Sequence, residues 1–306
     1  MRYIYMLVVG VVVLFSGCSD EEKKRVVEHI QDINIKDDEK VDTVTELSSK
    51  ISESSGLAYI DGNLWTHNDS GGEARLYAIS ETNGSVVKSV QISNAKNVDW
   101  EDLAVNDTHL FIGDFGNNKG KRENLKIYKI KRSDLKTEEV VEAEIIEFSY
   151  ATQDSFKYNS KTNFDCEAFI AYENQLFLFT KNHGDEKTDM YVLGIDAGKE
   201  VAEKVATFNT NALVTGASID VENGVLVLIG YNDKGTPKSW IFSNFIDSDF
   251  FKGDQEKITW GTPSKAQIEG VTHMGKGKLY ISSEKNDYAN SLGSFTIYPK
   301  IYNLNY

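Results

Sequence analysis

"EDLAVNDTHLFIGDF" (101–115) combines two acids, a short apolar strand, a polar turn and a second apolar strand. Four further segments follow the same order of residue types, namely SGLAYIDGNLWTHND (55–69), EAFIAYENQLFLFTK (167–181), TGASIDVENGVLVLIGYND (215–233) and EGVTHMGKGKLYISSE (269–284). The first residue of a segment precedes a leucine by nine positions in three of the five segments, by eleven in the fourth and by ten in the last. Self-similarity at a period of tens of residues predicts a repeat architecture.

More alternating segments follow the paired strands and extend the repeats. They are RLYAIS (75–80) and VVKSVQIS (86–93) in the first repeat, LKIYKIK (125–131) and AEIIEFSYA (143–151) in the second, and DMYVLGI (189–195) and EKVATFN (203–209) in the third. Four antiparallel strands per repeat are typical of a β-propeller blade. We therefore predict an all-β, five-bladed β-propeller over residues 41–306, in which VDTVTELS (41–48) adds a strand to the last blade and closes the ring. A six-bladed ring, with a degenerate blade inside 116–165, and a β-sandwich remain alternatives.

The N-terminus has the features of a targeting segment. Arg2 precedes the apolar run YMLVVGVVVLF (5–15), and LFSGC ends at Cys18. This arrangement resembles a bacterial lipoprotein signal, with residues 1–17 as the signal peptide. The resemblance implies that Cys18 carries acyl chains such as palmitate and becomes the mature N-terminus. An uncleaved anchor and an ordinary secretory signal are the alternatives.

Residues 18–40 are charged and poor in aromatic residues, which predicts a flexible acidic tether. Together with a lipidated Cys18, the tether places the protein in the bacterial cell envelope. The expected membrane is the outer membrane, with either a periplasmic or a surface-exposed face.

Composition narrows the classes of partner. The chain has 306 residues and a formal net charge of −14, so nucleic acid is excluded as a partner because phosphate binding needs concentrated Lys and Arg. We expect a monomer. Once Cys18 is lipidated, Cys166 is the remaining thiol, so no intrachain disulfide forms, and Cys166 is expected to be a small buried hydrophobe.

The first strand of every propeller blade lines the central channel, so equivalent strand starts face one another. The register places five oxygen-bearing residues there: Ser55, Glu101, Glu167, Thr215 and Glu269. Three converging carboxylates repel each other, and they must either bind a cation or hold protons. Hard oxygen ligands without sulfur or imidazole suit Ca²⁺. The alternative is that these side chains only bond to the neighbouring blade. Asp99 and Asp102 lie outside the register and are assigned supporting roles.

The order hydroxyl, Glu, Glu, hydroxyl, Glu resembles the calcium-activated nucleotidase (apyrase) family. The resemblance implies one Ca²⁺ in a five-bladed channel, held by Ser55, Glu101, Glu167 and Glu269, with Thr215 or Ser218 in place of the second serine. The segment THNDSGG (66–72) departs from the family's substrate loop because no arginine follows until Arg75. The repeats are also similar to phytase-esterase-like and other bacterial lipoprotein propellers, and to the calcium-binding lactonases.

Polar clusters follow the second strand of each repeat and predict a rim around the channel. His67 and Asp69 are candidate catalytic bases. The substrate-rim candidates are Asp114, Arg122, Lys181, Asn232 and Glu284. Arg75 and Lys285 are further candidate anion contacts. The same residue types are ordinary in turns, where Asn, Asp and Gly tolerate left-handed backbone.

Two functions follow from these observations. The first is an envelope lipoprotein whose propeller is a binding or interaction module for a small molecule, a glycan or a protein. The alternative is a Ca²⁺-dependent hydrolase of phosphoanhydrides, phosphoesters or lactones, in which the ion polarises the substrate or activates water. The fold does not decide between them.

Overall fold

The computed structural model describes residues 7–8, 11–12, 33–262, 265–290 and 293–306. The chain divides into two compact units, Met1–Asn34 and Ile35–Tyr306. In the first unit, β1 (Leu7–Val8) pairs with β2 (Val11–Val12). Cys18 lies outside the described residues, so its lipidation stays a prediction. Over the described ranges, no helix is both long enough and apolar enough to cross a membrane.

The alternating segments of the repeats form antiparallel strands, as the sequence predicts. The first repeat contains β5 (Ser54–Ile60), β6 (Asn63–Asn68), β7 (Arg75–Ile79) and β8 (Val86–Ile92). The second contains β9 (Trp100–Val105), β10 (His109–Asp114), β11 (Leu125–Lys131) and β13 (Glu144–Tyr150). The third contains β14 (Cys166–Tyr172), β15 (Gln175–Thr180), β16 (Thr188–Gly194) and β17 (Gly198–Phe208).

The fourth repeat contains β18 (Leu213–Asp220), β19 (Val225–Tyr231), β20 (Pro237–Ser243) and β21 (Asp254–Thr262). The fifth contains β22 (Ile268–His273), β23 (Lys278–Ser283) and β26 (Lys300–Asn305). Its fourth strand is β4 (Asp42–Glu46), from the start of the predicted propeller. The pairing of β4 with β26 confirms the closing strand that the sequence predicts at 41–48.

The remaining elements are short or peripheral. They are β3 (Ile33–Lys40), β12 (Val140–Val141), the hairpin of β24 (Asn286–Asn290) and β25 (Gly293–Ile297), the turns η1 (Ser49–Ile51) and η2 (Phe250–Lys252), and the helix α2 (Asp134–Thr137). β3, which includes residues assigned to the tether, lies beside β21 in the fourth sheet. Because the described helices are all this short, the predicted all-β class is confirmed.

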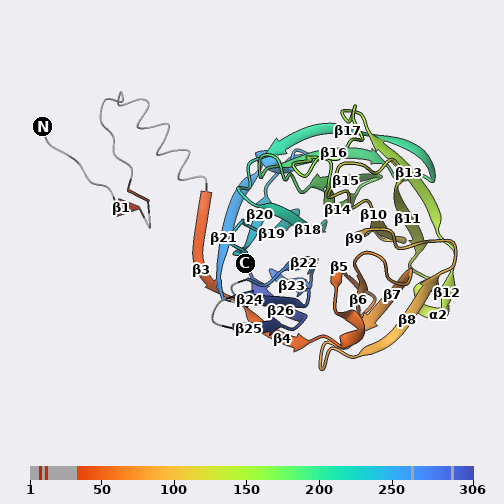
Figure 1. Cartoon of the computed structure of the whole chain (residues 1–306), viewed down its shortest axis with the longest axis horizontal. Coiled ribbons are helices and arrows are strands. Elements are labelled where there is room, and N and C mark those ends of the chain that lie inside the picture. Colours follow the sequence, from red (N-terminus) through yellow and green to blue (C-terminus); the bar gives the residue numbers. More distant parts are fainter. Residues whose placement is uncertain (1–6, 9–10, 13–32, 263–264, 291–292) are drawn as a thin grey trace, which may run out of the picture. The chain divides into compact units, whose positions relative to one another are not determined.

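The first strands of the repeats surround a central axis. β5 contacts β9, β9 contacts β14, β14 contacts β18, β18 contacts β22, and β22 contacts β5 again. Figure 1 shows these five strands innermost, with later strands of each repeat further out. β13 and β17 pair in parallel and join the second and third repeats into one eight-stranded sheet. The second unit is therefore propeller-like.

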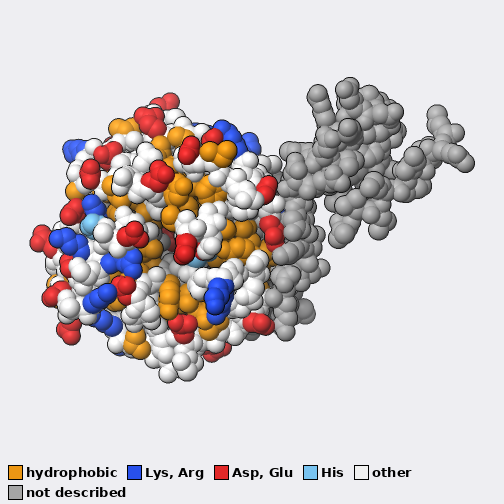
Figure 2. Space-filling model, turned by 180° about the vertical axis from the view of Figure 1, so that it is seen from behind, with side chains coloured by type: hydrophobic (Ala, Val, Ile, Leu, Met, Phe, Trp, Pro, Cys, Tyr) orange, Lys and Arg blue, Asp and Glu red, His pale blue; other side chains and the backbone are white. Residues whose placement is uncertain are grey.

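Apolar side chains fill the space between neighbouring repeats. Trp65, Trp100 and Tyr128 pack between the first and second repeats, and Phe115 packs on Phe169 between the second and third, with ring centroids 5.1 Å apart. Such edge-to-face pairs contribute about 0.5–1.5 kcal/mol beyond the area they bury. Cys166 is fully buried, as expected of a structural thiol, and burial raises the pKa of its thiol. On the face in Figure 2, hydrophobic side chains gather near the centre, with charged groups around them.

Candidate functional site

Each first strand has a register irregularity at its predicted channel residue. In β14, Cys166 pairs with Thr180 and Ala168 with Phe179, which leaves Glu167 as the extra residue. The shifts in the other first strands fall at Ser55, Glu101, Thr215 and Glu269. A β-bulge re-aims a side chain, and bulges are common beside functional sites. All five side chains, which we call the inner ring, are buried.

The two hydroxyls of the inner ring tie neighbouring repeats together. Ser55 Oγ donates to the carbonyl of Glu101, and Thr215 Oγ1 donates to the carbonyl of Ile268 at 2.5 Å. Each bond joins a first strand to the next first strand around the ring. Stapling, the alternative considered for this ring, therefore describes what the two hydroxyls do in this structure.

A second layer of residues follows the second strands. The residue two positions before an inner-ring residue accepts a main-chain N–H bond from Asp69, Gly116, Lys181 or Glu284, at 2.8–3.2 Å. In the fourth repeat, Leu213 pairs with Tyr231 in the same position. We call the residues at the ends of the second strands the outer ring; they are Asp69, Gly116, Lys181, Tyr231 and Glu284. They lie beside the inner ring because the two strands of each pair end at the same level.

Lys181 of the outer ring extends into the inner ring. Its Nζ lies 2.5 Å from Glu167 Oε2 and 5.4 Å from the ring centroid of Tyr231. Burial lowers the Lys181 pKa, but the charges of Glu167 and Glu269 more than offset this and hold the pKa well above its usual value. The ammonium therefore stays charged and offsets the charge of Glu167, with which it pairs.

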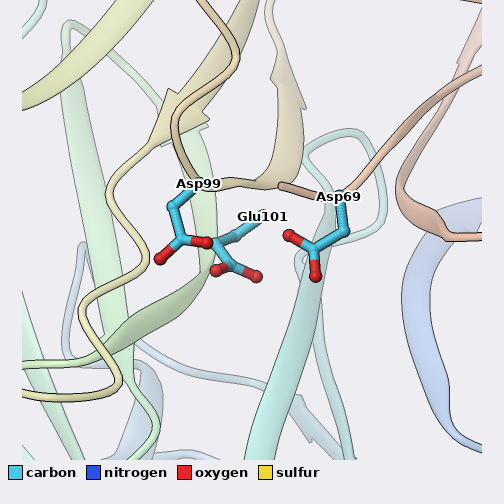
Figure 3. A group of neighbouring side chains, drawn as sticks. All are labelled: Asp69, Asp99 and Glu101. Carbon is cyan, nitrogen blue, oxygen red and sulfur yellow. The ribbon is translucent and has the colours of Figure 1, made fainter. Parts of the chain in front are cut away.

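Asp69, Asp99 and Glu101 gather on the other part of the ring. Their ligand oxygens all lie within 4.8 Å of one another, and Figure 3 shows the three carboxylates side by side. Neither the Asp99 nor the Glu101 carboxylate has a hydrogen-bond partner among the described residues, although Glu101 is only 5% exposed. Asp69 Oδ1 accepts the Ser70 N–H at 2.5 Å. This is the described group best placed to hold a metal ion.

The electrostatics of these three carboxylates favour a proton or a cation. Burial, and after it the charges of neighbouring carboxylates, raise the pKa of Asp69 and of Asp99 from 3.8 to about 6. Burial, together with the charges of Glu167 and Asp69, raises the Glu101 pKa well above its usual value. An oxygen-only ligand set of this kind suits Ca²⁺.

Gly116 of the outer ring makes room for this cluster. A Cβ built on Gly116 would overlap the carboxylates of Glu101 and Asp99. Gly116 occupies in the second repeat the position that Lys181 occupies in the third, so no side chain supplies a cation there. The Glu101 and Asp99 carboxylates therefore pack against bare main chain.

A histidine–aspartate pair lies beside the same channel mouth. His183 Nε2 is 2.7 Å from Asp165 Oδ2, and Asp165 Oδ1 accepts the Asn117 N–H at 2.6 Å. Asp165 is fully buried, whereas the His183 side chain is 22% exposed. The carboxylate therefore fixes the orientation of a partly accessible imidazole.

Asp102 has a larger role than the sequence assigns. Its Oδ2 accepts N–H bonds from Phe169 at 3.1 Å and Ala217 at 3.2 Å, and its Oδ1 accepts its neighbour's N–H. Burial raises the pKa of this carboxyl well above its usual range. One side chain thus connects the first strands of the second, third and fourth repeats.

The other predicted site residues are spread around the rim. His67 is fully buried against Trp100, its Nε2 has no partner among the described residues, and burial lowers its pKa to about 4. Asp114 pairs with Arg122 at 2.8 Å, and Asn232 accepts two N–H bonds within its own turn. Burial and the charge of Asp69 raise the Glu284 pKa to about 8. The catalytic or binding roles of these residues stay predictions.

Away from the acid cluster, the two remaining candidate anion contacts are paired with acids of their own. Arg75 Nε lies 2.8 Å from Glu73 Oε2, and Lys285 Nζ lies 2.6 Å from Asp287 Oδ2.

Sequence reasoning set Asp99 aside and overlooked Asp165 and its bond to His183. A signal was present, because DWE (99–101) and DCE (165–167) share an acid two positions before the inner-ring glutamate. The acids of both motifs flank the channel mouth.

No protein-family model matches the chain, and no curated protein matches its sequence. Among solved structures, the PQQ-bound aldose sugar dehydrogenase from Streptomyces coelicolor superposes with a TM-score of 0.45 at 11% identity, covering 87% of this chain and 97% of the other. A hypothetical selenium-binding protein from Sulfolobus tokodaii superposes with a TM-score of 0.42 at 11% identity, covering 82% of each chain. Because both TM-scores are below 0.5, the propeller-like architecture rests on the strand pairings alone.

Proposed function

We propose that the protein is an envelope lipoprotein whose five-bladed β-propeller binds one Ca²⁺ at the channel mouth and serves as a binding module. The observation that carries this proposal is the buried, unpartnered Glu101 carboxylate beside Asp69 and Asp99. The closed succession of five first strands supports the blade number. The lipoprotein part rests on the sequence around Cys18.

The proposed site uses one residue of the inner ring, Glu101. The resemblance to apyrases implies a ligand set spread over the inner ring, with Ser55, Glu101, Glu167, Thr215 and Glu269. Lys181 already neutralises Glu167, and the hydroxyls of Ser55 and Thr215 donate to main-chain carbonyls. Asp69, Asp99 and Glu101 are left with excess negative charge, so they are the stronger cation ligands.

A binding role follows from the incomplete shell that three carboxylates provide. Ca²⁺ takes 6–8 oxygen ligands. Three carboxylates leave positions for water, which an oxygen-bearing ligand such as a glycan or another small molecule displaces. Asp69 and Asp99 are both partly exposed, so such a ligand reaches the ion from the rim.

The test is thermal unfolding of the full chain with calcium and with chelator. A ligand that binds only the folded state adds about 2.7 kcal/mol at a hundred times its Kd, so calcium raises the Tm. We expect Glu101→Gln and Asp99→Asn each to abolish the rise. Asp107→Asn, in the turn between β9 and β10, keeps it. An equal Tm in calcium and chelator would refute the cation site.

A further inference from the structure

We propose that a cleft between the first and second repeats binds a small phosphate monoester, such as a sugar phosphate. The cleft has a volume of about 500 Å³, a size typical of small-molecule sites. Its walls come from the β5–β6 turn, the β9–β10 turn and the residues that follow β11. These segments lie at the opposite strand ends from Asp69, Asp99 and Glu101, so the proposal does not depend on calcium binding.

The cleft carries a surplus of positive charge on an acidic protein. Its walls contain three cations, Lys131, Arg132 and Lys136, and two acids, Asp61 and Asp107. The chain as a whole has a formal net charge of −14. The exposed Lys131 ammonium has no hydrogen bond or ion pair among the described residues. A concave site lined by one sign of charge attracts a ligand of the opposite sign.

Arg132 is held in place before any ligand arrives. Its main-chain N–H donates to the Thr108 carbonyl at 2.9 Å, and its Nη1 donates to the Asn106 carbonyl at 2.9 Å. The Arg132 side chain is nevertheless 24% exposed, so part of the guanidinium can be reached from solvent. A cation that is already oriented loses less entropy when it binds an anion.

Asp61 is shared by two of the cations and does not neutralise both. Its Oδ1 lies 3.2 Å from Arg132 Nη2, and its Oδ2 lies 3.3 Å from Lys136 Nζ. The Lys136 side chain is 60% exposed, and exposed ion pairs of this kind contribute little to stability. An incoming anion therefore competes with a single carboxylate for these two cations.

The short helix α2 is fastened to the first repeat, which fixes the backbone of Lys136. Lys88 Nζ, from β8, donates to the carbonyls of Leu135 at 2.7 Å and of Lys136 at 2.8 Å. Figure 1 shows α2 next to β8 and β12. The cleft is therefore bounded by anchored segments of two repeats.

A smaller hollow of about 170 Å³ extends the cleft and provides room for the body of a ligand. The two hollows have three charged residues in common: Asp61, Arg132 and Lys136. The smaller one adds apolar side chains: Ile60, Trp65 and Leu135. A molecule whose anionic group contacts the cations can thus place a small organic body against apolar carbon.

The number of cations favours a phosphate monoester over a carboxylate. A phosphate monoester carries a charge of about −1.5 to −2 at pH 7 and has three acceptor oxygens, whereas a carboxylate has one charge and two oxygens. Three cations around one cleft match the larger charge. Ion pairs of Arg and Lys with phosphate are also among the stronger hydrogen bonds.

The experiment is calorimetric titration of the full chain with glucose 6-phosphate in calcium-free buffer. We expect one site, and an affinity that falls as salt is added. Lys131→Met and Lys136→Met should each weaken binding about tenfold, the usual order for the loss of one charge-assisted hydrogen bond. Lys252→Met, which changes an exposed lysine of η2, is the matched control and keeps the affinity.

Asp61→Asn separates a binding site from a structural ion-pair cluster. Asp61 has a positive φ of 51°, which asparagine also tolerates, so the turn is kept. Loss of the competing carboxylate should tighten binding of glucose 6-phosphate about threefold. A purely structural cluster would give no tighter binding in this variant.

Further ligands define the class. Glucose should not bind, and gluconate should bind at least about tenfold more weakly than glucose 6-phosphate. Equal binding of gluconate would overturn the phosphate class, and sedimentation with phosphatidic acid vesicles without binding of glucose 6-phosphate would overturn the small-molecule class. No binding of glucose 6-phosphate, or equal affinity in the double variant Lys131→Met, Lys136→Met, would overturn the site. Glu101→Gln should leave the affinity unchanged, because the cation site is separate.

Discussion

The second and third repeats begin with the same motif and end in opposite electrostatic states. DWE (99–101) and DCE (165–167) each place an aspartate and an inner-ring glutamate at the channel mouth. In the third repeat, Lys181 pairs with Glu167 and His183 with Asp165. In the second repeat, Gly116 stands where Lys181 would, and both acids lack a partner among the described residues.

The difference shows that the end of the second strand decides what an acidic motif does. A lysine and a histidine two positions apart satisfy the two acids of the third repeat from across the strand pair. The glycine of the second repeat leaves its two acids to a proton or a cation. The unsatisfied motif is therefore the candidate cation site, whereas the two acids of the third repeat already have partners.

Replacing Lys181 should cause the largest loss of stability among the changes that test this difference between the two repeats. Lys181→Met leaves Glu167 buried without its counter-charge, and breaking a buried pair costs about 3–5 kcal/mol. Urea unfolding in chelator measures the loss. Lys252→Met, which removes an exposed ion pair, is the matched control. A loss below 1 kcal/mol would mean that Lys181 does not neutralise the third repeat.

The second-largest effect should be a dependence of the free energy of unfolding on pH, caused by the unpaired acids beside Glu101. The pKa values of Asp69 and Asp99 are raised in the folded state, so the folded chain keeps protons that the unfolded chain releases near pH 4. In chelator, the free energy of unfolding therefore falls as pH rises from about 4 to about 7, by at most about 3 kcal/mol per carboxyl. Calcium removes this fall.

Urea unfolding at pH 5 and pH 7.5, with chelator and with calcium, provides the measurement. The double variant Asp69→Asn, Asp99→Asn should flatten the curve in chelator. A stability that rises with pH over this range in chelator would show that the cluster is not the dominant titrating group.

A methyl group at Gly116 should have the smallest of these effects. Gly116→Ala forces the Cβ against the Glu101 and Asp99 carboxylates, and overpacking costs about 1–3 kcal/mol. Calorimetric titration with calcium should also show weaker binding, because the ligands move apart. Gly72→Ala is the control, since a Cβ there meets nothing within 4 Å. Unchanged calcium affinity in Gly116→Ala would place the ion elsewhere.

The sequence by itself determined the repeats and their register. Alternation and constant spacing are local properties, so they located the strand pairs, the closing strand and the inner-ring positions from Ser55 to Glu269. They could not show which side chains meet, because charge pairing depends on how neighbouring strands end.

Only the tertiary structure brought Lys181 onto Glu167, Asp69 to Asp99, and Asp102 to the main chains of two other repeats. The contacts of Asp69 and Asp102 join different repeats, and Lys181 meets Glu167 across the β14–β15 strand pair. The closed ring fixes them by packing the five first strands around one axis.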